Sequence, residues 1–278
     1  MTKHVFKSLL VIWLVLMLPG CGSSGGSSTV DLPPGEPPAL TQPQLPDVPN
    51  PRIKQMNIIS GITGITYPLR IYLPEDYESS EQHYPVIYAT DGQWIFNGFA
   101  STLDEKSVSA ILVAIEQGPG DRRSIDYLLP GARQYYRFLV TELLPTIERE
   151  YRIDPSQRTL SGASYGGVLV GAVLLLDDVV EPHFQNYLSF DASFYVHPQA
   201  TADLQTERFN ASSELHAILV LTSATSIGND IHVTNFQRVL EARNYTGLAI
   251  HRQKYPVHHN DVAGPSFEYA LDLIFSEQ

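Results

Sequence analysis

The sequence predicts an α/β fold, in which helices cover both faces of a mostly parallel sheet. Short apolar, β-prone runs alternate along the chain with segments whose apolar residues recur at helical spacing, a pattern typical of parallel sheets. The run Ala110–Ile115 is apolar throughout, as strands buried on both faces are. The chain from Arg52 onward is long enough for one such domain with a sizeable core.

The first expected elements lie before residue 152. Arg70–Leu73 is an expected strand that a proline stops, and 84–90 is a mostly apolar strand that runs into Asp91-Gly92. In 133–151, apolar side chains recur every three or four residues with charged residues between them, which predicts a helix. Pro145 should kink this helix or begin its last turns.

The second half of the chain continues the alternation. The short strand 158–161 precedes a segment, 168–176, that is rich in Ala, Val and Leu nearly all round, as a helix buried behind a central strand would be. The other expected strands are 187–190, 217–221 and 248–252, and the other expected helices are 233–243 and 265–275.

The most informative motif stands at the junction of that strand and helix, Gly162-Ala163-Ser164-Tyr165-Gly166-Gly167. A G-x-S-x-G sequence at such a junction is the nucleophile elbow of α/β-hydrolases, a turn so tight that the serine backbone is strained. The residues two before and two after the serine must be nearly free of side chain, and both are glycine. The turn also aims the Tyr165 N–H at the space beside the hydroxyl, which supplies half of an oxyanion hole. A plain Gly-rich loop is the alternative, but the flanking strand and helix favour the elbow.

Several segments around this motif resemble one family. The stretches 142–148, 151–154 and 158–167 look like the central part of the putative esterase family of α/β-hydrolases, which includes esterase D-like enzymes, ferric-siderophore esterases and feruloyl or acetylxylan esterases. The resemblance extends over nearly the whole domain and implies an α/β-hydrolase fold and a serine esterase activity. Weaker matching pieces are 84–86 with Asp91-Gly92, 123–127 with Pro130, and 259–262.

A serine hydroxyl needs a base that a carboxylate orients, and in this fold the chain order is serine, acid, histidine. Ser164 is the expected nucleophile. Two histidines precede the last helix, and the family pattern fits His259 better than His258. Asp230 is the expected acid because it is the only carboxylate in the loop after strand 217–221, although it could instead cap the following helix. Asp191, after the preceding strand, is the second choice.

Other site residues follow by analogy with the fold. The second oxyanion donor should be the backbone N–H of Gly92 or Gln93. Arg123 and Asp126 are expected to pair and brace the adjoining loop. No metal site is expected, because the cluster at 258–261 lacks a metal-binding spacing, and no cofactor is implied. Four aromatic residues could line a substrate pocket: Trp94, Phe96, Phe99 and Tyr195. For each of them, packing in the core is the alternative.

The N-terminus has the pattern of an exported lipoprotein. Residues 1–20 begin with a short basic stretch and continue with an apolar run that is too short to span a bilayer, as in a signal peptide. They lead into Cys21, the only cysteine of the chain, in a sequence that resembles a bacterial lipobox. Cys21 is therefore the expected lipidation site, and Gly22 in place of aspartate favours the outer membrane, facing the periplasm. An ordinary signal peptide with an incidental cysteine is the alternative.

Residues 21–51 are rich in Gly, Ser and Pro and are expected to be a flexible tether, with the folded domain at 52–278. Removal of residues 1–20 takes two lysines and changes the formal charge from −12 to −14. A chain this acidic has no electrostatic attraction for nucleic acid or anionic lipid. The sequence thus predicts an envelope-tethered serine esterase acting on a small-molecule ester. The alternatives are an acyltransferase on the same fold and an inactive binding lipoprotein.

Overall fold

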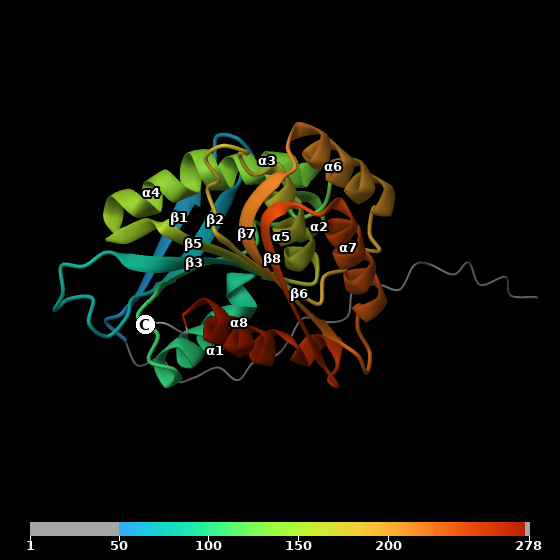
Figure 1. The fold of residues 1–278 in the computed structure, drawn as a ribbon. Coiled ribbons are helices and arrows are strands. Elements are labelled where there is room, and N and C mark those ends of the chain that lie inside the picture. Colours follow the sequence, from blue (N-terminus) through green and yellow to red (C-terminus); the bar gives the residue numbers. More distant parts are fainter. Residues whose placement is uncertain (1–49, 276–278) are drawn as a thin grey trace, which may run out of the picture. The chain divides into compact units, whose positions relative to one another are not determined.

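The expected strands come together in one sheet in the computed structural model, which describes residues 50–275 (Figure 1). The first two strand pairs across this sheet are antiparallel and the other five are parallel, so the prediction of a mostly parallel sheet is confirmed. In spatial order, the strands are β1 (Ile53–Ile59), β2 (Thr66–Tyr72), β4 (Ile111–Ile115), β3 (Tyr84–Thr90), β5 (Ile153–Ala163), β6 (Asn186–Phe190), β7 (Glu214–Ala224) and β8 (Thr246–Tyr255).

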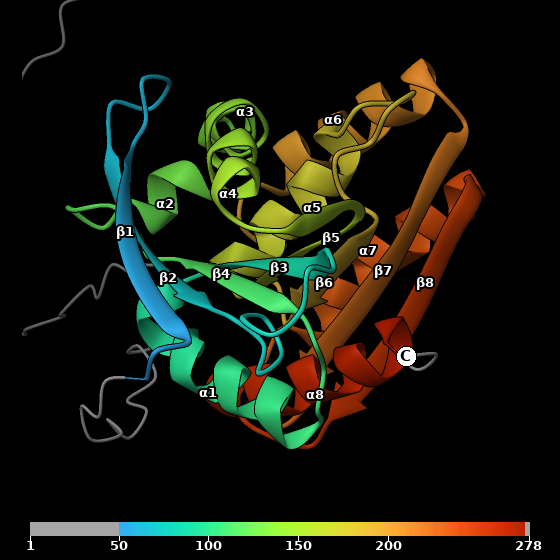
Figure 2. The same ribbon diagram turned by 90° about the vertical axis from the view of Figure 1, so that its left-hand side faces the viewer.

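Helices cover both faces of the sheet, as the views in Figures 1 and 2 show. One face carries α1 (Gly92–Glu105) and α8 (Ala263–Ile274), which pack side by side. A 3₁₀ turn at His259–Asp261 leads into α8. The other face carries α2 (Arg123–Asp126), α3 (Gly131–Phe138), α4 (Leu144–Glu150), α5 (Tyr165–Leu176), α6 (Pro198–Ala211) and α7 (Asp230–Arg243).

The core consists of two apolar layers, one on each side of the sheet. In β3, Val86 and Tyr88 face the layer that contains α5, whereas Ile87 and Ala89 face the layer under α1 and α8. Successive side chains of a strand point to opposite faces, and here both faces are buried, which is why these strands are apolar throughout. Helix α5 runs behind the central strands, and all its residues from Gly166 to Leu175 are buried.

The helix expected at 133–151 is present, but it is made of three pieces. A π-helical turn, Leu139–Leu143, joins α3 to α4, and Pro145 lies in the first turn of α4, where its missing N–H costs no intrahelical bond. Pro145 therefore begins the last turns of this helical segment, one of the two outcomes that the sequence allowed.

The elements β1, α6 and α1 are not among those that the sequence pattern predicts. The pattern places only the end of a strand at Asp91-Gly92, yet α1 begins there directly. Asp91 has a left-handed backbone with φ 64° and turns the chain from β3 into the helix. A Cβ on Gly92 would lie 2.9 Å from the carbonyl of Ala114 in β4, so only glycine allows the helix to start this close to the sheet.

The fold brings six loops to one edge of the sheet. Strands β3 to β8 are parallel, so the loops that follow them leave from the same edge. In open α/β sheets, this carboxyl edge is where ligands bind. The described helices include none that is long and apolar enough to cross a membrane. The predicted signal peptide, Cys21 and nearly all of the tether lie outside the described residues, and those assignments stay predictions.

Candidate active site

The G-x-S-x-G turn has the geometry that its sequence predicted. Ser164 lies between β5 and α5 with φ 57° and ψ −117°, a backbone conformation that is rare and strained for a residue with a side chain. A Cβ on Gly162 would lie 2.5 Å from the backbone of Gly166, and one on Gly166 would lie 2.3 Å from Oγ1 of Thr90. Both glycines are therefore required by close packing, and the turn is closed against the end of β3.

The structure brings His259 to this serine. His259 Nε2 lies 3.1 Å from Ser164 Oγ, although the two residues are 95 positions apart in the chain. The His259 backbone N–H donates to the carbonyl of Ile227 at 2.7 Å, which fixes the 3₁₀ turn against the loop after β7. His258, the other histidine considered, makes its recorded side-chain contact with the Asn260 N–H. The histidine within reach of the nucleophile is thus His259.

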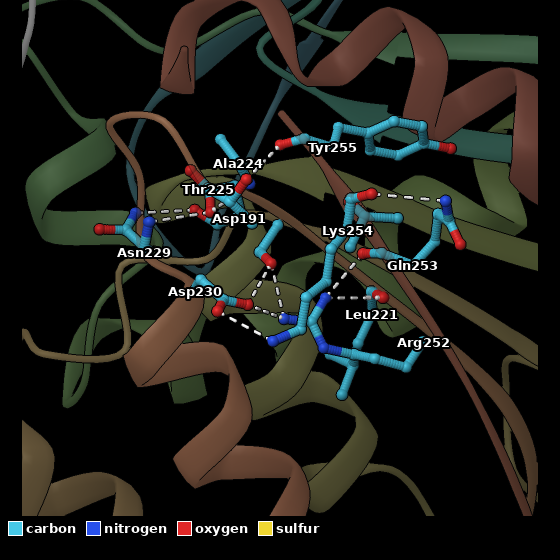
Figure 3. Close-up of polar contacts among 12 residues, drawn as sticks. Asp191, Leu221, Ala224, Thr225, Asn229, Asp230, Arg252, Gln253, Lys254 and Tyr255 are labelled. Atoms are coloured by element: carbon cyan, nitrogen blue, oxygen red, sulfur yellow. Dashed lines mark hydrogen bonds and ion pairs between the residues drawn. The ribbon is translucent and has the colours of Figure 1, made fainter. Parts of the chain in front are cut away.

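The carboxylate that faces this histidine is Asp191, at the end of β6. Its Oδ2 lies 2.5 Å from His259 Nδ1, and the residue is fully buried. Its Oδ1 accepts hydrogen bonds from the backbone N–H groups of Ala224, at 3.1 Å, and Asn229, at 2.9 Å (Figure 3). These donors stabilise the ionised carboxylate and orient it, so His259 carries its proton on Nδ1 and offers Nε2 to Ser164 as an acceptor.

Our expectation that Asp230 would face the histidine is wrong. Its carboxylate points toward β8 and accepts hydrogen bonds from Ser223 Oγ at 2.6 Å, Arg252 Nη2 at 2.6 Å and Lys254 Nζ at 2.9 Å (Figure 3). Burial alone would raise the pKa of Asp230, but the bonds from Ser223 and the two cations hold it below its ordinary value. Asp230 begins α7, and its side chain ties that helix to the sheet. The second choice, Asp191, has the required position.

The ends of two helices meet beside Ser164. Tyr165 is the first residue of α5, and Gly92 and Gln93 form the first turn of α1. Thr90, the last residue of β3, packs so closely against the elbow glycines that neither has room for a Cβ. A helix N-terminus carries partial positive charge and N–H groups that point outward, which suits it to stabilise an oxyanion. The oxyanion assignment of Tyr165, Gly92 and Gln93 is consistent with this arrangement and stays a prediction.

A buried ion pair braces the start of α1. Arg123 Nε and Nη2 donate to the two carboxylate oxygens of Asp91 at 2.7 and 3.1 Å, and both side chains are almost fully buried. The expected pair of Arg123 with Asp126 is therefore wrong, because Asp126 binds Arg122 at 2.6 Å instead. The Arg123 guanidinium also lies over the ring of Tyr165, 5.5 Å from its centroid, and so links the two helix starts.

The aromatic residues expected in a substrate pocket have different positions. Phe96 is fully buried in the layer under α1 and α8, and Phe99 stacks on Phe267 in the same layer, so these two belong to the core. Trp94 is half-buried, and its ring lies 4.9 Å from the Arg123 guanidinium. Tyr195 is 40% exposed. Only Trp94 and Tyr195 remain candidates for contact with a substrate.

Two polar residues at the site were not anticipated. Ser193 Oγ lies 3.2 Å from Ser164 Oγ, and Asn229 Nδ2 lies 3.2 Å from Ser193 Oγ. Both follow strands that end at the site edge, which is the only signal the sequence offers for them. In residues 50–275, no three His, Cys, Asp or Glu side chains are arranged to hold a metal ion.

Comparison with known proteins agrees with this geometry. The model of a family described as "Putative esterase" matches residues 60–190, which include the elbow. Ferri-bacillibactin esterase BesA of Bacillus subtilis is 28% identical over 143 residues, which are 40% of this chain and 48% of that protein, so the match spans about half of the relative.

Solved structures share the fold. An IroE-like serine hydrolase from Shewanella oneidensis has a TM-score of 0.69 and 24% identity, over 81% of this chain and 80% of its own. The BES protein from Bacillus cereus has a TM-score of 0.68 and 22% identity, over 84% and 99%. The family model thus includes the elbow, and the solved structures have the same α/β fold around it.

Proposed function

We propose that the protein is a serine esterase that hydrolyses carboxylic esters through an acyl-enzyme. The observation that carries the proposal is the continuous contact from Asp191 through His259 to Ser164, with distances of 2.5 Å and 3.1 Å. Serine, carboxylate and histidine follow in the chain order of this fold, and the family match supports the same chemistry. The proposal assigns this activity to three side chains, those of Ser164, Asp191 and His259.

The proposed reaction has two halves. In the first, Ser164 Oγ attacks the ester carbonyl while His259 Nε2 takes its proton and then gives it to the departing alcohol. In the second, His259 takes a proton from water, the water oxygen attacks the acyl carbon, and the acid product leaves. The Asp191 carboxylate keeps the histidine in the correct tautomer and stabilises its protonated form. The N–H of Tyr165, together with that of Gly92 or Gln93, receives the oxyanion.

The substrate is proposed to be a small-molecule ester, with siderophore esters, carbohydrate-linked acyl or feruloyl esters, and small acyl esters as the candidate classes. The named activity of the Bacillus subtilis relative makes a siderophore ester the first to test. A ferric tricatecholate is anionic, and Arg122 and Arg123 are each bound to an aspartate. Comparison of the iron-free and ferric forms of one siderophore would measure how much that charge matters.

Labelling with a fluorophosphonate tests the nucleophile and base directly. The full chain should form a covalent adduct, and Ser164→Ala and His259→Ala should not. If the unmodified protein folds but neither labels nor hydrolyses any activated ester, the esterase proposal fails and a binding role gains support. An added alcohol that captures the acyl group faster than water does would instead support the acyltransferase alternative.

We also propose that the domain is tethered to the cell envelope through a lipid on Cys21, at the periplasmic face of the outer membrane. The support is the sequence of residues 1–51: a basic and apolar leader, the lipobox-like Cys21, and a Gly/Ser- and Pro-rich spacer. Metabolic labelling with a radioactive fatty acid tests this in a Gram-negative host. Cys21→Ala should abolish the label and release the protein from membranes, and an unlabelled wild-type chain would refute the anchor.

A further inference from the structure

The reaction described above leaves one polar contact of the nucleophile unused. Ser193 Oγ lies 3.2 Å from Ser164 Oγ, and Ser193 is only 2% exposed. Its backbone N–H also donates to the Ser164 carbonyl at 3.3 Å, so the two serines are held together by two contacts. The buried Ser193 hydroxyl is therefore placed to interact with the nucleophilic oxygen during the reaction.

We propose that Ser193 is a catalytic residue, whose hydroxyl donates a hydrogen bond to Ser164 Oγ and assists the departure of that oxygen from the acyl-enzyme. The inference rests on the proposed esterase function and adds a fourth side chain to it. It depends on the direction of the contact between the two serines, which the neighbouring groups determine.

The histidine side of the network fixes where the Ser164 proton lies. His259 Nδ1 is 2.5 Å from the Asp191 carboxylate, which can only accept, so the proton of a neutral imidazole lies on Nδ1. Nε2 is then an acceptor, and the hydrogen bond of 3.1 Å between it and Ser164 Oγ uses the Ser164 proton. Because Ser164 has no second proton, its contact with Ser193 is a hydrogen bond only if Ser193 is the donor.

Asn229 imposes the same direction from the other side. Its side-chain nitrogen lies 2.8 Å from the Asp191 carbonyl oxygen, an obligatory acceptor, so this atom must be the amide nitrogen and not the oxygen. The same nitrogen lies 3.2 Å from Ser193 Oγ, where its second N–H donates. Ser193 therefore accepts from Asn229 and has its own proton available for Ser164. The hydrogen bonds run in one direction from Asn229 through both serines to His259.

This bond changes in strength during the reaction. In the acyl-enzyme, Ser164 Oγ is an ester oxygen and a weak acceptor. After water has added, the bond between the acyl carbon and Oγ breaks, its electron pair stays on Oγ, and His259 Nε2 returns to Oγ the proton that it took from water. Oγ is most negative at that moment, and a donor already in place stabilises it in the transition state more than in the acyl-enzyme. Ser193 should thus accelerate deacylation more than acylation.

The test compares Ser193→Ala with Ser189→Ala in the full chain, with p-nitrophenyl acetate as substrate. Ser189 is a matched control because it is a fully buried serine of β6, the strand that precedes Ser193, and its hydroxyl donates to the carbonyl of Gly167 and not to Ser164. Thermal unfolding and the rate of fluorophosphonate labelling report on the fold and on attack by Ser164. Steady-state and burst kinetics, with intact-mass detection of the acetylated enzyme, report on deacylation.

For Ser193→Ala we expect kcat to fall by about tenfold, the rate equivalent of one charge-assisted hydrogen bond. KM should fall with it, a burst should appear, and acetyl-enzyme should accumulate, while labelling stays within a few-fold of wild type and Ser189→Ala retains wild-type kinetics. An unchanged kcat would overturn the inference. So would an equal loss of kcat, kcat/KM and labelling rate without acetyl-enzyme, because Ser193 would then only hold the nucleophile. A wild-type protein that neither labels nor turns over would instead refute the esterase function itself.

Discussion

Replacement of Asp191 by asparagine should inactivate the enzyme through a single displaced proton. The Oδ1 position receives two backbone N–H groups, from Ala224 and Asn229, so it must be occupied by the oxygen of the new amide. The amide nitrogen is then forced into the Oδ2 position, opposite His259 Nδ1. A donor there requires Nδ1 to accept, which moves the imidazole proton to Nε2, where it faces Ser164.

The size of the effect follows from this change of tautomer. With a proton on Nε2, His259 cannot take the proton of Ser164, although every heavy atom stays near its original place. Loss of the correct tautomer in a serine–histidine–aspartate site costs roughly 10⁴-fold in kcat. The Asp191→Asn protein should remain folded, since the amide still accepts both backbone N–H groups, and its KM should change little.

Asp230→Asn is the matched control, because Asp230 is the carboxylate that the sequence favoured and the structure directs away from His259. We expect kcat within about threefold of wild type and a loss of about 1–2 kcal/mol in the free energy of unfolding, from weakened bonds to Arg252 and Lys254. The folded pKa of Asp230 is below its ordinary 3.8, so its stabilisation is present above that pH and is lost as the pH falls further. The stability difference between the two proteins should therefore close in acid below pH 3.8.

Hydrolysis of p-nitrophenyl acetate by both variants, with active-site titration to count competent molecules, is the assay. An Asp191→Asn enzyme that keeps more than about a tenth of the wild-type kcat would contradict the displaced-proton mechanism. So would an Asp230→Asn enzyme that loses as much activity as Asp191→Asn at full stability. A crystal structure of Asp191→Asn at high resolution would show whether the amide nitrogen faces the histidine.

Three further predictions concern residues that affect the folding and stability of the domain. Gly166→Ala should yield little folded protein in expression trials, because its Cβ would lie 2.3 Å from Thr90 Oγ1, at the point where the elbow is closed. Ser161→Ala should unfold in urea at the same midpoint as wild type or at a higher one, since the buried Ser161 hydroxyl has no hydrogen-bond partner within residues 50–275. The Asp177 carboxylate accepts a hydrogen bond from His183 Nδ1, and this bond raises the pKa of His183 above 6.5. The stabilisation of the fold by protonated His183 is fully present below pH 6.5 and is lost as the pH rises through the folded pKa. The free energies of unfolding of wild type and His183→Ala, measured in urea, should therefore converge at alkaline pH.

The sequence identified those parts of the site that depend on a few adjacent residues. The strained turn at Ser164 needs glycine on both sides, and the strand before it and the apolar helix after it are equally local patterns, so six residues predicted the nucleophile and its backbone geometry. The chain order of the fold then limited the base to the loop before the last helix, and the family pattern selected His259. The mostly parallel sheet was predictable for the same reason, since its buried strands are apolar on both faces.

The tertiary structure decided which carboxylate serves that histidine. Asp191 and Asp230 both stand at the ends of expected strands, and the sequence does not reveal which way either side chain points. That depends on the cations that β8 presents to Asp230, and on backbone donors from the loop after β7 that surround Asp191. The contacts between Ser193, Asn229 and Ser164 likewise join loops after three different strands. The nucleophilic turn and the order of its partners could be predicted from the sequence, because these are short-range properties of the chain. The acid and the hydrogen-bond direction through the two serines were decided only when packing fixed distant loops against each other.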